Sequence, residues 1–381
     1  MNAPVRILHA HSTFALGGKE ARSVRLINAF GGAARHTILT ATPGGTSARE
    51  GIDRGIAVAF PGDAPPLKGV PGLPRLFRLS RYMRGFDLVL TYNWGAFDAV
   101  MARHLFGGPP LVHHEDGFNE DEAGQLKTRR NLYRRLGLSA ARRLVVPSRR
   151  LEAIARKAWG QPAHRIERIA NGVETARYAA APADDALPGL APGKDEIVIG
   201  AVAGLRAVKN LPRLVRAFAA MGMTESRLVI VGEGPESERI AAEARARGVA
   251  DRVLMPGFHA EPWRYIGRFD IFALSSDSEQ FPISLVEAMA AGLPAVATNV
   301  GDVASMVSAD NQPLIVAPDD EAAFAAALDT LAARPDLRRA IGRANREKAA
   351  AEYDEKEMIA RYATLYGEAV GDTQAFIAAT P

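Results

Sequence analysis

Two glutamates, Glu279 and Glu287, have seven residues between them in this chain of 381 residues. Pro282 suits a first helical turn and residues 284–291 have the pattern of a helix, so we expect Glu279 on the preceding loop and Glu287 about one turn inside the helix. A carboxylate accepts hydrogen bonds from sugar hydroxyls, and the free N–H groups of a helix start bind phosphate. This spacing indicates a sugar-nucleotide site, with a pair of ordinary surface carboxylates as the alternative.

A pair of glycines, Gly17 and Gly18, follows the first predicted strand and precedes a predicted helix over residues 21–30. Glycines at such a turn let backbone N–H groups approach a phosphate, and the helix N-terminus adds a favourable dipole. The surrounding sequence has neither the spacing of a Walker motif nor the three spaced glycines of a dinucleotide fingerprint. A phosphate-binding turn and a plain turn both stay open.

Two histidines and two acidic residues occupy positions 113–116, after another predicted strand. Four adjacent residues do not converge easily on one ion without other ligands, so we expect no metal site here. A contact to a substrate and a structural role stay open for these side chains. The Asn-Trp-Gly turn at residues 93–95 follows a predicted strand, and here too lining a substrate site and forming a plain turn stay open.

The elements that must position these residues alternate along the chain. Short β-branched apolar runs alternate with longer segments of helical period, which is typical of parallel sheets in α/β layers. The predicted strands are residues 5–9, 36–42, 56–60, 88–92, 110–113, 143–146 and 166–169 in the first half, and 197–202, 227–231, 252–255, 271–273, 294–298 and 314–316 in the second. The fold class is therefore α/β, with two Rossmann-like, doubly wound domains.

A stretch rich in Ala, Pro, Asp and Gly over residues 181–194 has the composition of an exposed linker. It predicts an N-terminal domain over residues 1–185 and a C-terminal domain over residues 186–381, and the length of the chain suits two domains. The final helices cover the second sheet in this prediction, and packing back on the N-terminal domain is the alternative. Because open α/β sheets bind ligands beyond the carboxyl ends of their strands, we expect the site in a cleft that the two domains face.

The composition excludes several classes of protein. With 48% apolar residues, 24% charged residues and no cysteine, the chain is neither a disulfide miniprotein nor a thiolate metal protein. It has no signal-peptide pattern and no apolar stretch of about 18 residues. We therefore expect a cytoplasmic protein, with peripheral contact to the inner face of the cell membrane as an alternative.

Charge is divided unevenly between the two halves. Residues 1–180 carry 27 Lys and Arg against 14 Asp and Glu, whereas residues 181–381 carry 20 against 29. The basic half favours an anionic membrane surface as a partner, with a merely solubilising surface as the alternative. A predicted helix over residues 73–84 has Arg78, Arg81 and Arg84 opposite its apolar side, which is typical both of membrane-surface helices and of ordinary α/β helices. Nucleic acid is not expected, because the second half is acidic and no recognised binding motif occurs.

Several motifs, in this order along the chain, resemble those of the family 4 glycosyltransferases, retaining enzymes of GT-B architecture that use nucleotide sugars. The resemblance is specific over residues 278–294 and looser in the first half. The other matching stretches are Gly17-Gly18-Lys19-Glu20, Val146-Pro147-Ser148, Ile169-Ala170-Asn171-Gly172-Val173, Lys209-Asn210, Val231-Gly232-Glu233-Gly234-Pro235 and Thr298-Asn299-Val300-Gly301. Together they extend over most of the chain.

This resemblance implies roles for individual residues. Glu287 would bind the ribose hydroxyls of the nucleotide, and Glu279 would lie beside the donor sugar. The backbone of Ser284 and Leu285 would contact the diphosphate. Lys209 matches the diphosphate-binding lysine of the family, whose ammonium offsets the charge that builds on the leaving group.

Two positions depart from the family pattern. Gly204 stands where the family usually carries an arginine five residues before the lysine, and Arg206 is the nearest substitute. Gln280 stands where a glycine is commoner. Family members often carry, in the stretch that corresponds to residues 113–116, a histidine that faces the donor sugar. The resemblance implies this role for His113 first.

These observations predict a retaining, metal-independent glycosyltransferase that moves a sugar from a nucleoside diphosphate sugar, a UDP-sugar being favoured, to a glycolipid or polysaccharide acceptor in cell-surface glycan synthesis. The predicted catalytic residues are Lys209, Glu279 and His113, and the predicted donor-binding residues are Gly17, Gly18, Arg206, Lys209, Ser284, Leu285 and Glu287. No cofactor or metal is expected beside the donor substrate. The alternatives are a nucleotide-sugar epimerase of the same architecture and a non-catalytic sugar-nucleotide-binding protein.

Overall fold

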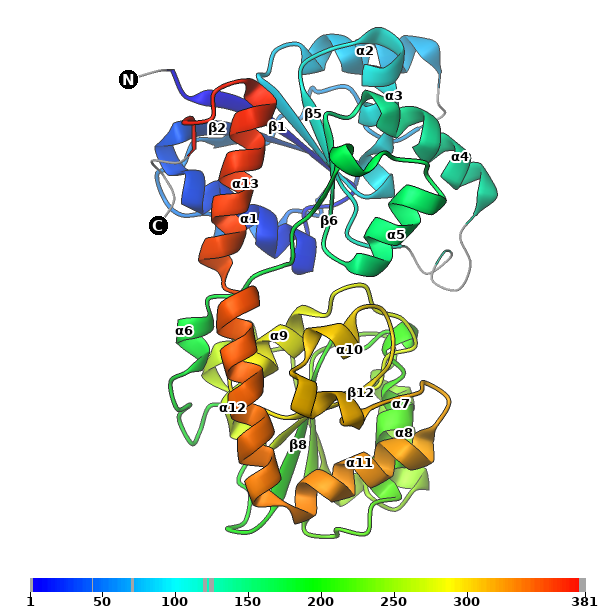
Figure 1. Cartoon of the computed structure of the whole chain (residues 1–381), viewed down its shortest axis with the longest axis vertical. Helices are drawn as coiled ribbons and strands as arrows, with labels where there is room; N and C mark the ends of the chain where they lie inside the picture. The colour runs from blue at the N-terminus through cyan, green and yellow to red at the C-terminus, as the bar shows by residue number, and fades with distance from the viewer. Residues whose placement is uncertain (1–2, 43, 70–71, 119–121, 123–126, 377–381) are drawn as a thin grey trace. The chain divides into compact units, whose positions relative to one another are not determined.

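The computed structural model describes residues 3–42, 44–69, 72–118, 122 and 127–376. The chain divides into two compact units, one made of Met1–Asn171 with Lys356–Pro381 and the other of Gly172–Glu355. Each unit contains one parallel sheet with helices packed against it (Figure 1). The predicted α/β class with two doubly wound sheets is confirmed.

The first sheet, in the part of the chain that is described, has seven strands in the order β3-β2-β1-β4-β5-β6-β7. The strand order reverses at β1, which pairs in parallel with β2 on one side and with β4 on the other. The strands are β1 (Val5–His11), β2 (Ala34–Thr40), β3 (Val58–Ala59), β4 (Leu88–Tyr92), β5 (Leu111–His114), β6 (Arg143–Val146) and β7 (Ile166–Arg168). The main helices of this unit are α1 (Gly18–Phe30), α2 (Leu73–Met83), α3 (Phe97–Phe106), α4 (Thr128–Gly137), α5 (Arg149–Lys157) and α13 (Glu355–Val370).

The second sheet has the strand order β10-β9-β8-β11-β12-β13 and reverses at β8, which pairs in parallel with β9 and β11. Its strands are β8 (Ile197–Val202), β9 (Ser226–Val231), β10 (Val253–Gly257), β11 (Ile271–Leu274), β12 (Ala295–Thr298) and β13 (Ile315–Val316). The helices are α6 (Thr175–Tyr178), α7 (Leu211–Ala219), α8 (Ser237–Ala246), α9 (Ile283–Ala290), α10 (Val303–Met306), α11 (Glu321–Ala333) and α12 (Pro335–Glu352). Each strand in the two sheets overlaps a predicted one.

Alternate residues of the first sheet pack on opposite faces, as the period of two along a strand requires. Leu8 and Val89 point to the core under α2, α3 and α5, whereas Ile7 and Leu90 point to the core under α1 and α13. In Figure 1, α13 lies on the same face as α1.

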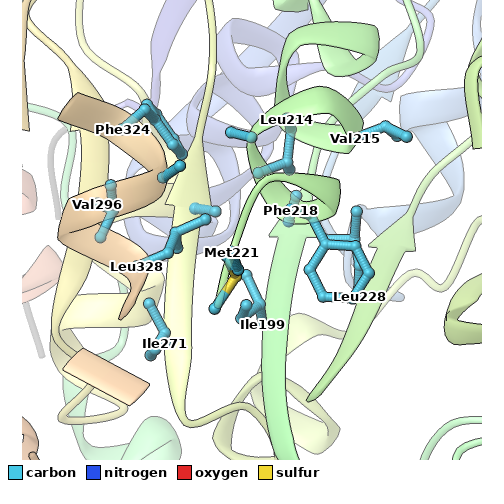
Figure 2. Close-up of a cluster of buried hydrophobic side chains, with 14 of the residues drawn as sticks. Ile199, Leu214, Val215, Phe218, Met221, Leu228, Ile271, Val296, Phe324 and Leu328 are labelled. Atoms are coloured by element: carbon cyan, nitrogen blue, oxygen red, sulfur yellow. The ribbon is translucent and has the colours of Figure 1, made fainter. Parts of the chain in front are cut away.

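The core of the second unit lies between its sheet and the helices α7, α8 and α11. Figure 2 shows Phe218 of α7 beside Ile199 and Leu228 of the sheet, with Phe324 and Leu328 of α11 at the other side of the cluster. Each of these side chains is fully buried. Burying a side chain of this size stabilises the fold by about 1.5–3 kcal/mol.

The division between the units differs from the boundary predicted near residue 185. Residues 181–194 have the composition of a linker, but the chain already packs within the second unit from residue 172 onward. Tyr178 donates a hydrogen bond to Glu287, and Asp184 forms an ion pair with Arg268. The chain crosses again at residues 355 and 356, so α11 and α12 belong to the second unit and α13 to the first.

Helix α2 has the predicted amphipathic pattern. Leu76, Leu79 and Met83 are buried, whereas Arg78 and Arg81 are exposed. No helix within the described ranges is both long and apolar enough to cross a membrane.

Candidate active site

The loops after β8 and β11 meet where the second sheet reverses its strand order. Ligands of open α/β sheets bind at the carboxyl ends of the strands at such a point. The ammonium Nζ of Lys209, from the first loop, lies 2.5 Å from Oε1 of Glu279, from the second. The two side chains keep exposed fractions of 17% and 10%. The structure therefore brings together two of the three residues predicted to be catalytic.

Hydrogen bonds fix these two loops against each other. The N–H of Asp277 donates to the carbonyl of Val208 at 2.8 Å, and Oγ of Ser275 donates to the carbonyl of Lys209 at 3.0 Å. Asn210 has left-handed backbone angles, φ 42° and ψ 48°, and its Nδ2 donates to the Asp277 carboxylate at 3.1 Å. Asparagine tolerates this conformation better than most residues. The Lys-Asn pair thus combines a cation with a residue that shapes its loop.

Motif glycines allow neighbouring loops to approach these two. Gly301, after β12, has a φ of +59°, and a Cβ there would lie 2.3 Å from the carbonyl oxygen of Glu279. Gly232, after β9, has a φ of +144°, and a Cβ there would lie 1.9 Å from the carbonyl oxygen of Ala203. Only glycine fits such contacts and dihedral angles without strain.

Glu287 lies inside α9 and is 8% exposed. Its Oε1 accepts a hydrogen bond from the Tyr178 hydroxyl at 3.1 Å. Burial and, secondarily, the negative charge of Glu287 raise the pKa of the Tyr265 hydroxyl. A buried carboxylate needs such polar partners, because an unpaired one is costly. Tyr178 is a partner that the sequence analysis missed, since no local pattern marks a tyrosine as the partner of a glutamate 109 residues away.

Helix α9 begins after Pro282, which places Glu279 on the preceding loop and Glu287 within the helix as predicted. No side chain among the described residues caps this N-terminus. The first N–H groups of a helix have no partner within it, so the backbone at Ser284 can bind an anion. The N–H of Leu285 lies 3.2 Å from the carbonyl of Pro282, and the Leu285 side chain is buried.

Arg206 is exposed and bends back over Gly204. Its Nε lies 3.7 Å from the place that a Cβ on Gly204 would occupy. The arginine therefore occupies space beside the position where the resemblance expects one.

The glycine pair of the first unit lies at the carboxyl end of β1. Gly17 precedes α1 in extended backbone, with φ −161° and ψ 176°, and Gly18 begins the helix. A Cβ on Gly17 would lie 3.0 Å from Oε2 of Glu20, which forms an ion pair with Lys19. Burial raises the pKa of Glu20. A side chain at position 17 would require Glu20 to shift by a few tenths of an ångström, and the extended φ itself does not require glycine.

His113 is buried in the core of the first unit, with no exposed surface. Its Nδ1 lies 2.8 Å from Oγ1 of Thr91, its Nε2 lies 3.6 Å from Oε2 of Glu115, and its ring packs edge-on against Phe97 of α3. His113 lies two residues after Leu111 on β5, so both side chains are on the face of the sheet that packs under α3. This geometry assigns His113 a structural role and does not support its predicted contact to the donor sugar.

A buried cation that the sequence analysis missed lies nearby on α1. Arg22 donates to Oδ2 of Asp116 at 2.9 Å and to Oδ1 of Asn171 at 2.9 Å. Asn93, with a φ of 54°, accepts a hydrogen bond from the N–H of Asp116 at 2.7 Å. The turn at residues 93–95 therefore organises the carboxyl end of β4 and β5. Its signal in the sequence is only an asparagine directly after an apolar strand.

Comparison with known proteins identifies both halves of the chain. Residues 16–177 match the sequence model of the family described as Glycosyltransferase Family 4, and residues 185–348 match the one described as Glycosyl transferases group 1. The N-acetyl-alpha-D-glucosaminyl L-malate synthase of Bacillus anthracis is 27% identical over 181 residues, 47% of this chain and 47% of that protein. The N-acetylgalactosamine-N,N'-diacetylbacillosaminyl-diphospho-undecaprenol 4-alpha-N-acetylgalactosaminyltransferase of Campylobacter jejuni is 31% identical over 174 residues, 45% of this chain and 47% of that protein.

The chain spans about half the length of the curated relatives it matches. Among solved structures, Anabaena HepE in complex with UDP has a TM-score of 0.78 at 18% identity, covering 95% of this chain and 100% of that one. This likeness shows the fold. With its two halves matched in order and its fold shared with these structures, the chain belongs to the family 4 type of glycosyltransferases, which have the GT-B fold.

Proposed function

We propose that the chain is a retaining, metal-independent glycosyltransferase that transfers a sugar from a nucleoside diphosphate sugar to a glycolipid or polysaccharide acceptor in cell-surface glycan synthesis. The observation that carries this proposal is the Lys209–Glu279 pair at the strand reversal of the second sheet, followed by α9 with its buried Glu287. A cation, a helix N-terminus and two carboxylates match the diphosphate, the sugar and the ribose of such a donor.

Positive charge at this site acts on the leaving group. As the bond between the anomeric carbon and the diphosphate breaks, negative charge builds on the diphosphate oxygens. Lys209, the start of α9 and the guanidinium of Arg206 supply positive charge from the protein itself. A fixed cation that meets developing charge stabilises the transition state more than the ground state.

Retention of configuration follows, in this proposal, from departure and attack on the same face of the sugar. The acceptor oxygen forms the new bond to the anomeric carbon while the bond to the diphosphate breaks. The acceptor proton passes to an oxygen of the leaving phosphate. No protein nucleophile is needed, and we assign none.

The comparisons support a UDP-sugar and a surface-glycan acceptor. Structures of Anabaena HepE hold UDP or UDP-glucose, and the Campylobacter jejuni relative is named for a diphospho-undecaprenol acceptor. The Bacillus anthracis relative is named for L-malate, so acceptors differ within this type. The charge of the first half, 27 basic against 14 acidic residues over positions 1–180, favours an acceptor presented at an anionic surface.

Peripheral contact to the inner face of the cell membrane is part of this proposal. Leu73 and Phe77 on α2 have exposed fractions of 64% and 45%, beside the exposed arginines of the same helix. Exposed apolar side chains among basic ones are typical of helices that lie on a membrane surface. Replacing Arg78, Arg81 and Arg84 together by Gln should release the protein from phosphatidylglycerol vesicles at low salt. Unchanged co-sedimentation would reject this surface.

A panel of sugar nucleotides tests the donor class. A ligand that binds only the folded protein raises its free energy of unfolding by RT ln(1 + [L]/Kd), about 2.7 kcal/mol at 100 times Kd. We expect UDP-sugars to raise the thermal midpoint more than GDP- or ADP-sugars at equal concentration. A midpoint that no nucleotide sugar moves would contradict the proposed function.

A further inference from the structure

We propose that Glu279 holds the ammonium of Lys209 in the donor-free protein and exchanges this ion pair for a sugar contact when the diphosphate binds, while Ser276 keeps Glu279 in position. This inference deepens the proposed function and rests on it. It concerns how one site distinguishes a diphosphate that carries a sugar from one that has lost it.

One carboxylate oxygen has two donors in this site. Oε1 of Glu279 accepts from Nζ of Lys209 at 2.5 Å and from Oγ of Ser276 at 2.7 Å. The ammonium of Lys209 is the same group that the proposed function assigns to the diphosphate. A diphosphate carries more negative charge than one carboxylate, so it can draw the ammonium away from Glu279. Because the pair is partly exposed to water, breaking it costs less than breaking a fully buried pair.

Glu279 is anchored so that it cannot follow Lys209. Oγ1 of Thr298, a fully buried side chain, donates to the carbonyl of Ser276 at 2.6 Å, and Ser276 itself is 1% exposed. Gly301 lies so close to the carbonyl of Glu279 that a Cβ there would approach it to 2.3 Å. The backbone is therefore fixed at both ends of the short segment 276–279. When the ammonium leaves, Ser276 still donates to Oε1, and the remaining acceptor capacity of the carboxylate becomes available to a hydroxyl of the sugar.

The loop of Lys209 is also fixed, so the exchange needs only a side-chain rotation. Oγ of Ser275 donates to the carbonyls of Lys209 and Asn210 at 3.0 and 3.1 Å. The Asn210 amide and the Asp277 N–H add further bonds between the two loops. A four-carbon lysine side chain can turn between two partners while its backbone stays in place.

The exchange has a different energetic outcome for donor and product. A sugar nucleotide removes Lys209 from Glu279 but offers the carboxylate a hydroxyl in return. The bare diphosphate left after transfer removes Lys209 and offers nothing, so Glu279 competes against it for the ammonium. Glu279 therefore favours binding of the donor over retention of the product. Ser276 acts through Glu279 and is a positioning residue.

Isothermal titration of UDP, UDP-glucose and inorganic pyrophosphate tests this exchange. Pyrophosphate makes one arm of the test independent of the base and the sugar. We expect Glu279→Gln, which keeps the shape but removes the charge, to bind UDP and pyrophosphate about 2- to 5-fold more tightly than the wild type, the size expected for a partly exposed ion pair. The same variant should lose most of the preference of the wild type for UDP-glucose over UDP.

Asp277→Asn is the matched control, because it removes one negative charge from the same loop. Asp277 is 48% exposed, pairs with Arg213 at 2.7 Å and accepts from Nδ2 of Asn210 at 3.1 Å, and Lys209 is not its partner. The amide oxygen of Asn keeps an acceptor for Asn210, so the loop of Lys209 keeps this bond. We expect this variant to keep the ratio of UDP-glucose to UDP affinity within about twofold of the wild type. An equal gain in UDP affinity would show a general charge effect and overturn the exchange.

Ser276→Ala separates positioning from charge. Glu279 keeps its charge in this variant but loses its second donor, so UDP affinity should stay near that of the wild type while the preference for UDP-glucose falls. A ratio equal to that of the wild type would overturn the role of Ser276, and weaker UDP binding by Glu279→Gln would overturn the exchange itself. A wild-type protein that binds none of the three probes would contradict the proposed function as well.

Discussion

The two sheets each reverse their strand order once, and the charged groups near the two reversals differ in their exposure to solvent and in their partners. At the second sheet, Lys209 and Glu279 keep exposed fractions of 17% and 10% and contact each other. At the first, the side chain of Arg22 is 3% exposed and is held by Asp116 and Asn171. The same topology thus holds a partly exposed ion pair in one unit and a buried network of charged and polar groups in the other.

Arg22→Ala should have the largest effect and acts on the first unit alone. It leaves Asp116 without its cation, and removing one partner of a buried pair costs about 3–5 kcal/mol in the free energy of unfolding. Urea unfolding followed by tryptophan fluorescence measures this loss. Arg78→Ala, on the exposed side of α2, is the control and should change the free energy of unfolding by less than about 0.5 kcal/mol. Equal midpoints for the two variants would remove the contrast between the units.

Lys209→Ala should have the next largest effect, and on turnover rather than folding. Loss of a group that stabilises the transition-state charge costs about 2.7–4 kcal/mol, or roughly a hundred- to a thousandfold in kcat. The rate of UDP release from UDP-glucose measures it. If only KM changes, Lys209 does not act on the leaving group.

Glu287→Ala should weaken donor binding by about 1.5–3 kcal/mol, because a hydrogen bond from a ribose hydroxyl to a charged group is lost. Tyr178→Phe, which removes only the hydroxyl that donates to Glu287, should cost about 1 kcal/mol. Isothermal titration with UDP measures both. Wild-type affinity in the Glu287 variant would disprove the ribose assignment.

A fall in pH should lower the stability of the first unit before that of the second. Burial lowers the pKa of His36 to about 4 and lowers the pKa values of His9, His11 and His114 well below their usual range. These rings are neutral when folded, and the unfolded chain takes up their protons below about pH 6.5. Their contribution to stability is therefore complete above pH 6.5 and is lost as the pH falls from 6.5 towards 4, by up to about 1.4 kcal/mol per pH unit for each ring.

The uneven distribution of histidines makes this prediction specific to one unit. The second unit contains one histidine, His259, among its residues 172–355. The Trp263→Phe variant leaves Trp94 and Trp159 to report unfolding of the first unit. Its urea midpoint should fall between pH 7.5 and pH 5.0, and a constant midpoint would contradict the effect.

The sequence patterns predicted the sheets better than the ends of their strands. The β-branched runs of β4, β6 and β8 match the predicted residues, because apolar runs between helical segments are a local signal. His113 shows where that signal fails. The histidine shares a face of β5 with Leu111, and its burial results from the helix layer on that face, which no local pattern shows.

The candidate site could likewise be predicted only in part. Glu279 and Glu287 lie within one short motif, and their placement before and inside α9 is as predicted. Tyr178 contacts Glu287 in the second unit, and Arg22 contacts Asp116 in the first. The two residues of each pair are distant in sequence, so spacing could not reveal either contact. The composition of residues 181–194 resembles a linker, yet Asp184 packs within the second unit through its pair with Arg268.

The thermal unfolding midpoint with and without UDP, for the wild type and for Lys209→Ala side by side, tests most directly whether the second sheet binds a nucleotide diphosphate at its strand reversal. We expect the same concentration of UDP to raise the midpoint of the wild type clearly and that of the variant much less, since the stabilisation follows RT ln(1 + [L]/Kd). An equal rise in both proteins, or a rise in neither, would contradict it.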